Sequence, residues 1–146
     1  MKISIITVCF NSEATIIDTI NSVNSQSYKN IEHIFVDGGS NDDTVKILKN
    51  NPNKKKKVII QNGSSIYEAM NTGIKKSSGN IIQILNSDDV LHSNTIIEKM
   101  IAKIKKFPNY DIYLGNVVFF SNNNFYKIKR YFTADNNKIK NLINGD

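Results

Sequence analysis

Short apolar runs and helix-like periodic segments alternate along most of the chain. Residues 3–10 form a continuous run of mostly β-branched side chains, which is typical of a strand covered on both faces. From residue 13 to about residue 27, apolar side chains recur at the spacing of a helix. This alternation predicts four strands, at residues 3–10, 31–36, 58–61 and 81–85, and four helices, at residues 13–27, after Ser40, at 66–76 and at 94–107.

Two further strands, at residues 113–120 and 125–131, are predicted beyond this alternation, with a turn at 121–124. The last segment is polar, asparagine-rich and weakly patterned. A chain of 146 residues has the length of a single domain, and it contains no internal repeat. We therefore expect one α/β domain over residues 1–132, followed by a polar tail over residues 133–146.

Local signals also predict how two of the helices begin and pack. Ser40, with Asp43 three residues later, predicts a capping box for the second helix. In the third helix, Met70 and Ile74 are expected in the core, because they share one face.

Strands that alternate with helices predict a mainly parallel sheet with helices on both faces. Right-handed crossovers place the carboxyl ends of all the strands at one edge. Ligands of such sheets bind in the crevice beyond that edge. The candidate site residues are therefore those that follow the strands, at positions 10–11, 37–39, 61–63 and 86–89.

Asp88 and Asp89 are adjacent carboxylates just past a buried strand. Two such groups repel each other and lose hydration unless a positive charge lies beside them. A divalent cation held by these acids and by substrate phosphates would remove that repulsion. Alternatively, the acids simply lead into the next helix, where they favour the helix dipole.

Other strand ends and the third helix supply further candidates. Asp37 ends a strand before two glycines, and Gly39 lets a ligand approach the backbone closely; the alternative is an ordinary turn acid. Phe10 is suited either to stack on a planar base or to cap the core. Tyr67 and Asn71 share a helix face and are suited to bind a ligand or to brace a loop.

The formal net charge is +6, with lysines densest at residues 54–57, 103–106 and 127–130. Such a balance favours phosphate-bearing ligands, anionic membranes or nucleic acid, and is also that of a solvated lysine-rich surface. A nucleic-acid binder would need a clustered basic stripe with interleaved aromatic residues. These lysines instead flank helices and loops, so no nucleic-acid partner is expected.

Several other classes of site are missing from the sequence. The chain has one cysteine, Cys9, which excludes an internal disulfide and a cysteine-rich zinc site. It has no phosphate-binding loop of the Walker type and no dinucleotide fingerprint. The N-terminus begins directly in a strand-like run, and no apolar stretch is long enough to cross a bilayer. We therefore expect a cytoplasmic protein.

Four segments together resemble the family-two (inverting, GT-A fold) glycosyltransferases, most closely the bacterial branch that builds surface polysaccharide and O-antigen. These segments are SIITVCFN, VDGGSNDDT, IYEAMNTG and ILNSDD, which begin at residues 4, 36, 66 and 84. They occur in the family's order and cover about residues 1–120.

The resemblance implies a function and a set of roles. It implies a nucleotide-diphosphate sugar donor, with UDP favoured, a saccharide or lipid-linked acceptor, and Mn²⁺ or Mg²⁺ bridging the diphosphate. A lipid-linked acceptor would bring the protein into peripheral contact with the inner membrane face. The implied metal ligands are Asp88 and Asp89, and the implied donor-binding residues are Val8, Phe10, Asn11, Asp37, Gly39, Tyr67, Asn71, Asn86 and Asp89.

The sequence also departs from the family pattern. Asn86 stands where the family often has the first acid of its D-x-D motif. The two acids that usually precede the Ile-Tyr helix are absent from residues 61–65. No residue matches the family's general base, which an inverting displacement needs near the acceptor hydroxyl. We therefore expect a truncated chain that binds donor but transfers sugar poorly; the alternative is a non-catalytic nucleotide-sugar-binding fragment.

Overall fold

The computed structural model of the chain describes residues 1–53, 55–63, 65–121 and 124–132. The predicted tail over residues 133–146 lies outside the described residues. The elements are β1 (Ile3–Cys9), α1 (Ile16–Asn24), β2 (Ile31–Asp37), α2 (Thr44–Asn50), β3 (Lys56–Ile60), α3 (Ile66–Lys76), β4 (Ile81–Ile84), α4 (Ile96–Lys106), β5 (Val117–Ser121) and β6 (Asn124–Phe132).

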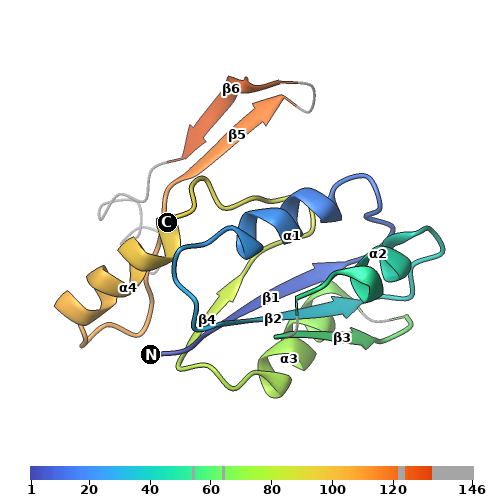
Figure 1. The fold of residues 1–146 in the computed structure, drawn as a ribbon, viewed down its shortest axis with the longest axis horizontal. Coiled ribbons are helices and arrows are strands. Elements are labelled where there is room, and N and C mark those ends of the chain that lie inside the picture. The colour runs from blue at the N-terminus through green and yellow to red at the C-terminus, as the bar shows by residue number, and fades with distance from the viewer. Residues whose placement is uncertain (54, 64, 122–123, 133–146) are drawn as a thin grey trace, which may run out of the picture. The chain divides into compact units, whose positions relative to one another are not determined.

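Strands β1 to β4 form one all-parallel sheet in the order β3-β2-β1-β4 (Figure 1). The predicted parallel α/β sheet is therefore confirmed. Residues 1–105 form one compact unit, and residues from 106 onward form a second that contains the antiparallel pair β5–β6. The strand predicted from residue 113 begins at Val117, so residues 113–116 are not part of it.

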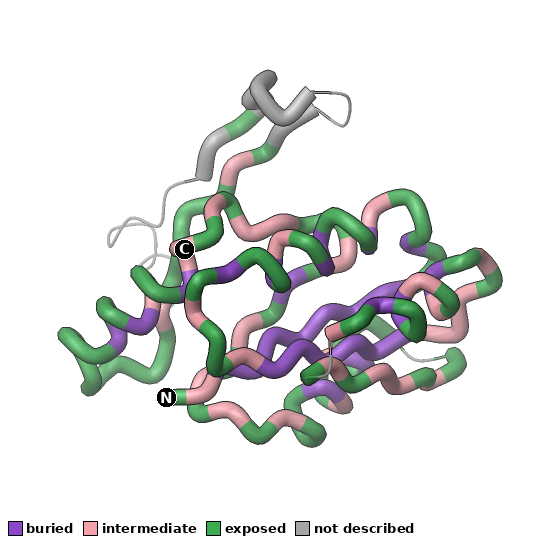
Figure 2. The backbone as a smooth tube through the Cα atoms, viewed as in Figure 1, coloured by how far each residue is buried: buried purple, intermediate pink, exposed green. Residues whose placement is uncertain are grey.

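Helices cover both faces of the parallel sheet, as predicted. On one face, Ile3 and Ile5 of β1 pack with Val23 of α1 and Ile97 of α4. A second cluster on that face joins α1, β2 and α2. On the other face, Ile6 packs with Ala69 of α3. All seven residues of β1 are buried, which explains the uninterrupted apolar run (Figure 2).

Gly73 lets α3 approach β1 closely. A Cβ atom on Gly73 would collide with Cγ2 of Ile6, and it would lie 3.4 Å from Val36 Cγ2. Met70 is half-buried against this cluster, as predicted. The prediction that Ile74 lies in the core is wrong, since Ile74 is 40% exposed.

The capping box belongs to α3 and not to α2. Ser65 Oγ accepts from Glu68 N–H, and the Glu68 carboxylate accepts from Ser65 N–H. Helix α2 begins after Asp43 without any side-chain cap. The prediction of a capping box at Ser40 is therefore wrong, because the Ser40 hydroxyl binds the carboxylate of Asp37 instead.

A buried carboxylate, Glu32, joins the strands at the edge where they begin. Glu32 Oε1 accepts from Ser4 Oγ at 2.5 Å and from Ser78 N–H at 2.6 Å. Its Oε2 atom lies 3.1 Å from the Nζ atoms of both Lys2 and Lys57. Burial alone raises the pKa of Glu32, but the hydrogen bonds from Ser4, Ser78 and Lys57 outweigh it and hold that pKa well below its ordinary value.

His33 lies fully buried in the middle of β2. Its Nε2 atom is 2.9 Å from Thr7 Oγ1, and its ring centroid is 3.9 Å from that of Phe35. Among the described residues, none hydrogen-bonds His33 Nδ1. Burial lowers the pKa of His33 to about 3, so the ring is neutral in the folded protein near neutral pH.

Candidate functional site

The loops that follow β1 to β4 meet at one edge of the sheet, as the strand-end rule predicts. We refer to residues 10–12, 37–40, 61–63 and 86–89 as the rim. Asn11 N–H donates to Ser40 Oγ at 2.9 Å, and the Gly38 carbonyl accepts from Gly63 N–H at 3.3 Å. Ser12 Oγ and Ser87 Oγ lie 2.8 Å apart. Direct hydrogen bonds therefore connect all four loops.

The turn after β2 is organised by the carboxylate of Asp37. Asp37 Oδ1 accepts from Gly39 N–H at 3.0 Å and from Ser40 N–H at 2.8 Å. Its Oδ2 atom accepts from Ser40 Oγ at 2.6 Å. Asp37 is fully buried, so a ligand can reach its carboxylate only if the atoms that cover it move.

Gly39 is required by the geometry of this turn. Its φ is +94°, a conformation that glycine adopts without steric penalty. A Cβ atom on Gly39 would lie 2.8 Å from Asn62 Oδ1. The loops after β2 and β3 therefore lie side by side here, and a side chain at position 39 would have to displace that of Asn62.

The three predicted donor-binding residues near the end of β1 lie in different environments. Phe10 is 59% exposed, so of the two predicted roles the structure excludes capping the core. Val8 is buried and packs in the cluster beneath α3. Asn11 has a φ of +48°, and its Oδ1 atom accepts from Asn41 N–H at 2.9 Å. Asn11 therefore braces the neighbouring turn, whereas Phe10 presents an open ring face.

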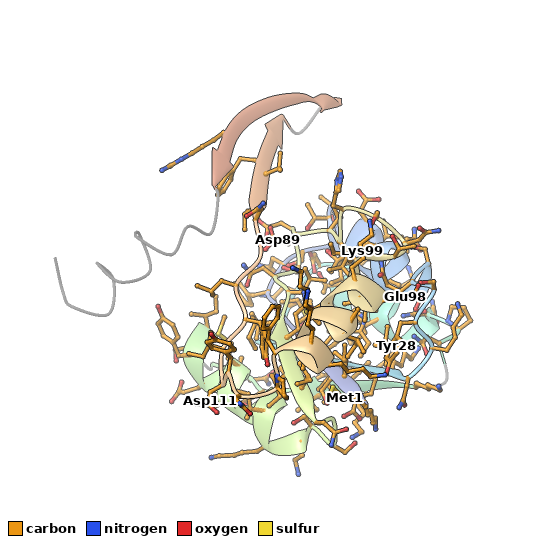
Figure 3. The ribbon with its side chains drawn as sticks, turned by 90° about the vertical axis from the view of Figure 1, so that its left-hand side faces the viewer. Met1, Tyr28, Asp89, Glu98, Lys99 and Asp111 are labelled. Atoms are coloured by element: carbon orange, nitrogen blue, oxygen red, sulfur yellow. The ribbon has the colours of Figure 1, made fainter. Side chains whose placement is uncertain are left out.

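Asp88 and Asp89 lie on the connection between β4 and α4. Asp89 is labelled in Figure 3. Both acids are exposed. Asn86 Nδ2 donates to Asp89 Oδ2 at 3.1 Å, and Asp89 N–H donates to the Asn86 carbonyl at 3.1 Å. Partial burial and the neighbouring charge of Asp88 raise the pKa of Asp89. The two acids therefore form a like-charged pair, as their adjacency in sequence predicts.

This pair fits a divalent cation that is completed by a ligand. In the part of the chain that the structure describes, no three or more His, Cys, Asp or Glu side chains gather to hold a metal by themselves. Mg²⁺ commonly keeps several waters and uses one or two carboxylates together with substrate phosphates. Two exposed carboxylates under mutual repulsion meet that description.

Tyr67 and Asn71 lie on the outer side of α3. Tyr67 is 73% exposed, and Asn71 is also exposed. Ala69 and Gly73, which face the sheet, are the buried residues of this helix. Both predicted residues are therefore accessible to a ligand.

The sequence analysis did not identify two buried hydroxyl groups that contact the rim. Ser12 and Thr19 both hydrogen-bond to the loop after β4. Their sequence signal is weak, because serine and threonine near a helix start are read as local caps. For Thr19, the available signal is a polar residue on the apolar face of an amphipathic helix.

Solved structures share this architecture. S. aureus TarS is similar with a TM-score of 0.68 and 28% sequence identity, covering 73% of this chain and 33% of that chain. TarS has also been solved in complex with UDP-GlcNAc and with UDP. Mannosyltransferase PcManGT from Pyrobaculum calidifontis, in complex with GDP-Man and Mn²⁺, is similar in fold, with a TM-score of 0.64, 18% identity, and coverage of 86% of this chain and 37% of that one.

Curated relatives found by sequence similarity are named as glycosyltransferases. The glycosyltransferase GlyA of Streptococcus pneumoniae is 30% identical over 122 residues, which are 82% of this chain and 17% of the relative. An uncharacterized glycosyltransferase of Haemophilus influenzae is 36% identical over 102 residues, which are 68% of this chain and 40% of the relative. The chain thus spans less than half the length of these curated relatives.

The sequence pattern of glycosyl transferase family 2 matches residues 4–145, nearly the whole chain. The predicted family and its GT-A fold are therefore confirmed. No described helix is long and apolar enough to span a membrane. The chain belongs to glycosyl transferase family 2.

Proposed function

We propose that the rim binds a nucleotide-diphosphate sugar, with a UDP-sugar favoured, together with Mn²⁺ or Mg²⁺. In the whole protein, we propose that this sugar is transferred to a saccharide or lipid-linked acceptor in polysaccharide biosynthesis. A lipid-linked acceptor would place the protein on the cytoplasmic side of the membrane, in peripheral contact with it. The observation that carries the proposal is the like-charged pair of Asp88 and Asp89, on a rim built from four strand ends.

The first part of the proposed donor site is a place for the base. The exposed ring of Phe10 offers a stacking face, and it lies next to the Gly38 backbone, where an added Cβ would be 3.4 Å from the ring. The turn held by Asp37, with Gly39, forms the adjacent wall. Asn11 braces this wall by accepting from Asn41 N–H, and Val8 packs with Val36 in the cluster beneath α3. The complexes of TarS with UDP-GlcNAc and UDP support uridine as the favoured nucleoside.

The second part is a place for the diphosphate and the sugar. Asp88 and Asp89 would hold the cation, and Asn86 would orient Asp89 through the hydrogen bond that it donates. When bound, the cation neutralises the charge that develops on the departing nucleoside diphosphate. Tyr67 and Asn71, exposed on α3, would contact the sugar side of the donor. We assign no general base to this chain.

Calorimetric titration of the chain with UDP and GDP, each with and without Mn²⁺, tests the proposed donor site. We expect UDP to bind more tightly when Mn²⁺ is present, and GDP to bind more weakly than UDP. Replacing Phe10 with Ala should weaken UDP binding by about 1–3 kcal/mol, the usual contribution of base stacking on an aromatic ring. A chain that binds neither nucleotide at millimolar concentration would contradict the proposal.

A second candidate function, a nucleotide-sugar-binding fragment without catalysis, is favoured by the loop after β3. Where the family usually has an acid, this chain has Gln61, and its Oε1 atom accepts from Thr72 Oγ1 at 2.6 Å. The neutral, half-buried Gln61 side chain therefore hydrogen-bonds within the protein. Tight metal-dependent binding of UDP-sugar, without release of UDP when an acceptor extract is added, would identify this second function.

A further inference from the structure

Three polar residues, two in α1 and one just beyond it, hydrogen-bond to one distant segment. Thr19 and Ser22 lie three residues apart in α1, and Gln26 follows two residues after the helix ends at Asn24. Thr19 is fully buried and Gln26 is 1% exposed. We refer to these three residues as the polar row of α1. Buried polar groups need hydrogen-bond partners, and all three find them in one segment.

Thr19 hydrogen-bonds to the loop that carries Asp88 and Asp89, the two acids proposed to bind the metal. Its Oγ1 atom lies 3.0 Å from the carbonyl oxygen of Ser87 and 2.8 Å from that of Asp89. These two carbonyls flank Asp88, so the single hydroxyl hydrogen of Thr19 is shared between the residues on either side of a proposed metal ligand.

The rest of the row holds the segment that follows. Ser22 Oγ accepts from Leu91 N–H at 3.2 Å. Gln26 Nε2 donates to the Ser93 carbonyl at 2.8 Å, and its Oε1 atom accepts from Ile97 N–H at 3.2 Å. The residues between β4 and α4 belong to no helix or strand. Hydrogen bonds from the polar row therefore satisfy backbone groups that regular secondary structure would otherwise pair.

We propose that the polar row of α1 is a set of positioning residues that fixes the backbone around Asp88 and Asp89 for cation binding. The inference rests on the proposed donor site and deepens it. Residues that orient metal ligands without touching the metal commonly contribute 10- to 100-fold to metal affinity. Thr19 is the member of the row closest to the acids along the hydrogen-bonded chain, so its removal should have the largest effect.

The Thr19→Val variant tests this role, because valine keeps the shape of threonine and removes the hydroxyl. Thr19→Ser keeps the hydroxyl and serves as the rescue variant. Ser25→Ala is the matched control, since Ser25 is exposed and its hydroxyl bonds only to the Ser22 carbonyl within the same helix turn. Melting temperatures identify any variant that fails to fold.

Two measurements are made on each variant. Hydrogen exchange of the amides of residues 88–91 reports the order of the loop without any ligand, and it should become faster in Thr19→Val only. Calorimetry with UDP, with and without Mn²⁺, should show the Mn²⁺-dependent gain in affinity falling about tenfold in Thr19→Val. UDP affinity without metal should stay close to that of the wild type.

The outcomes separate the two proposals. Wild-type protein that binds no UDP with Mn²⁺ would overturn the proposed function, and with it the role of the row. Wild-type binding with an unchanged Thr19→Val variant would overturn the inference alone. Equal losses of affinity with and without Mn²⁺ would also overturn it, because they would indicate general unfolding of the rim.

Discussion

Both ends of the parallel sheet carry carboxylates, but the protein shifts their pKa values in opposite directions. Where the strands begin, Glu32 is buried among hydrogen-bond donors and two ammonium groups, and its pKa lies well below its ordinary value. Where the strands end, Asp88 and Asp89 lie together, and the pKa of Asp89 is raised. The first carboxylate is fully compensated by the protein.

This difference distinguishes an acid that stabilises the fold, Glu32, from the two acids that we propose to bind a cation. A folded chain gains stability from a carboxylate whose charged form it stabilises, as at Glu32. A pair of acids that disfavour each other's charge instead contributes binding energy when a cation arrives. Removal of a carboxylate should therefore have opposite consequences at the two ends of the sheet.

The largest expected effect is that of Glu32→Ala on stability. Ser4, Ser78 and the two lysines would lose their common acceptor, and the free energy of unfolding should fall by about 3 kcal/mol. Urea unfolding at neutral pH measures this change. Glu32→Gln keeps one acceptor and should be intermediate; a Glu32→Ala variant as stable as the wild type would erase the contrast between the two ends.

The opposite change is expected for Asp88→Asn. Loss of one ligand charge should weaken the Mn²⁺-dependent binding of UDP by at least about tenfold. The melting temperature should stay unchanged or rise, because the repulsion on Asp89 is removed. Asp111→Asn, at an exposed acid outside the helices and strands, is the matched control for the loss of one charge and should change neither quantity. Lower stability of Asp88→Asn would contradict the assignment.

Acid sensitivity provides a third test, through His33. Its pKa is near 6.5 in the unfolded chain and about 3 when folded, so between these values the unfolded state binds the extra proton. Stability should therefore fall by about 1 kcal/mol between pH 6.5 and pH 5.5. Glu32, with its low folded pKa, adds to this loss only at more acidic pH. In His33→Gln, urea midpoints should be nearly constant over that interval; an unchanged slope would exclude His33 as the cause.

The smallest effect is expected at an exposed ion pair. Lys46 Nζ lies 3.3 Å from Asp43 Oδ2 on α2, and both side chains are more than 60% exposed. Solvent screens such pairs, so Lys46→Ala should change the free energy of unfolding by less than about 0.5 kcal/mol. Measured beside Glu32→Ala, this variant shows how much of the effect at Glu32 comes from burial.

The fold was largely predictable because β1 and β2 are buried on both faces, and such strands have nearly continuous apolar sequences. The order of strands and helices then placed the strand ends at one edge. The location of Asp37, Asp88 and Asp89 on that edge required only this rule. Motif resemblance added the family, which the comparison with known proteins confirmed.

The choice of partner for individual hydroxyl groups could not be predicted from the sequence. Ser40 and Ser65 both begin an S-x-x-acid sequence, yet only Ser65 caps a helix, because the Ser40 hydroxyl is taken by Asp37. Thr19 lies 70 residues from Asp89, its hydrogen-bond partner. The helical period predicts which side of α1 is buried. It does not predict that the buried side includes a polar residue, Thr19.

The close packing of α3 on β1 affects one side of the proposed donor site more directly than the other. The missing methyl group of Gly73 sets the height of α3 above the sheet, and this helix carries Tyr67 and Asn71. Asp88 and Asp89 lie instead in the loop after β4, where the carbonyls of Ser87 and Asp89 accept from Thr19 of α1. One added carbon at position 73 would therefore act first on α3, the helix that carries Tyr67 and Asn71.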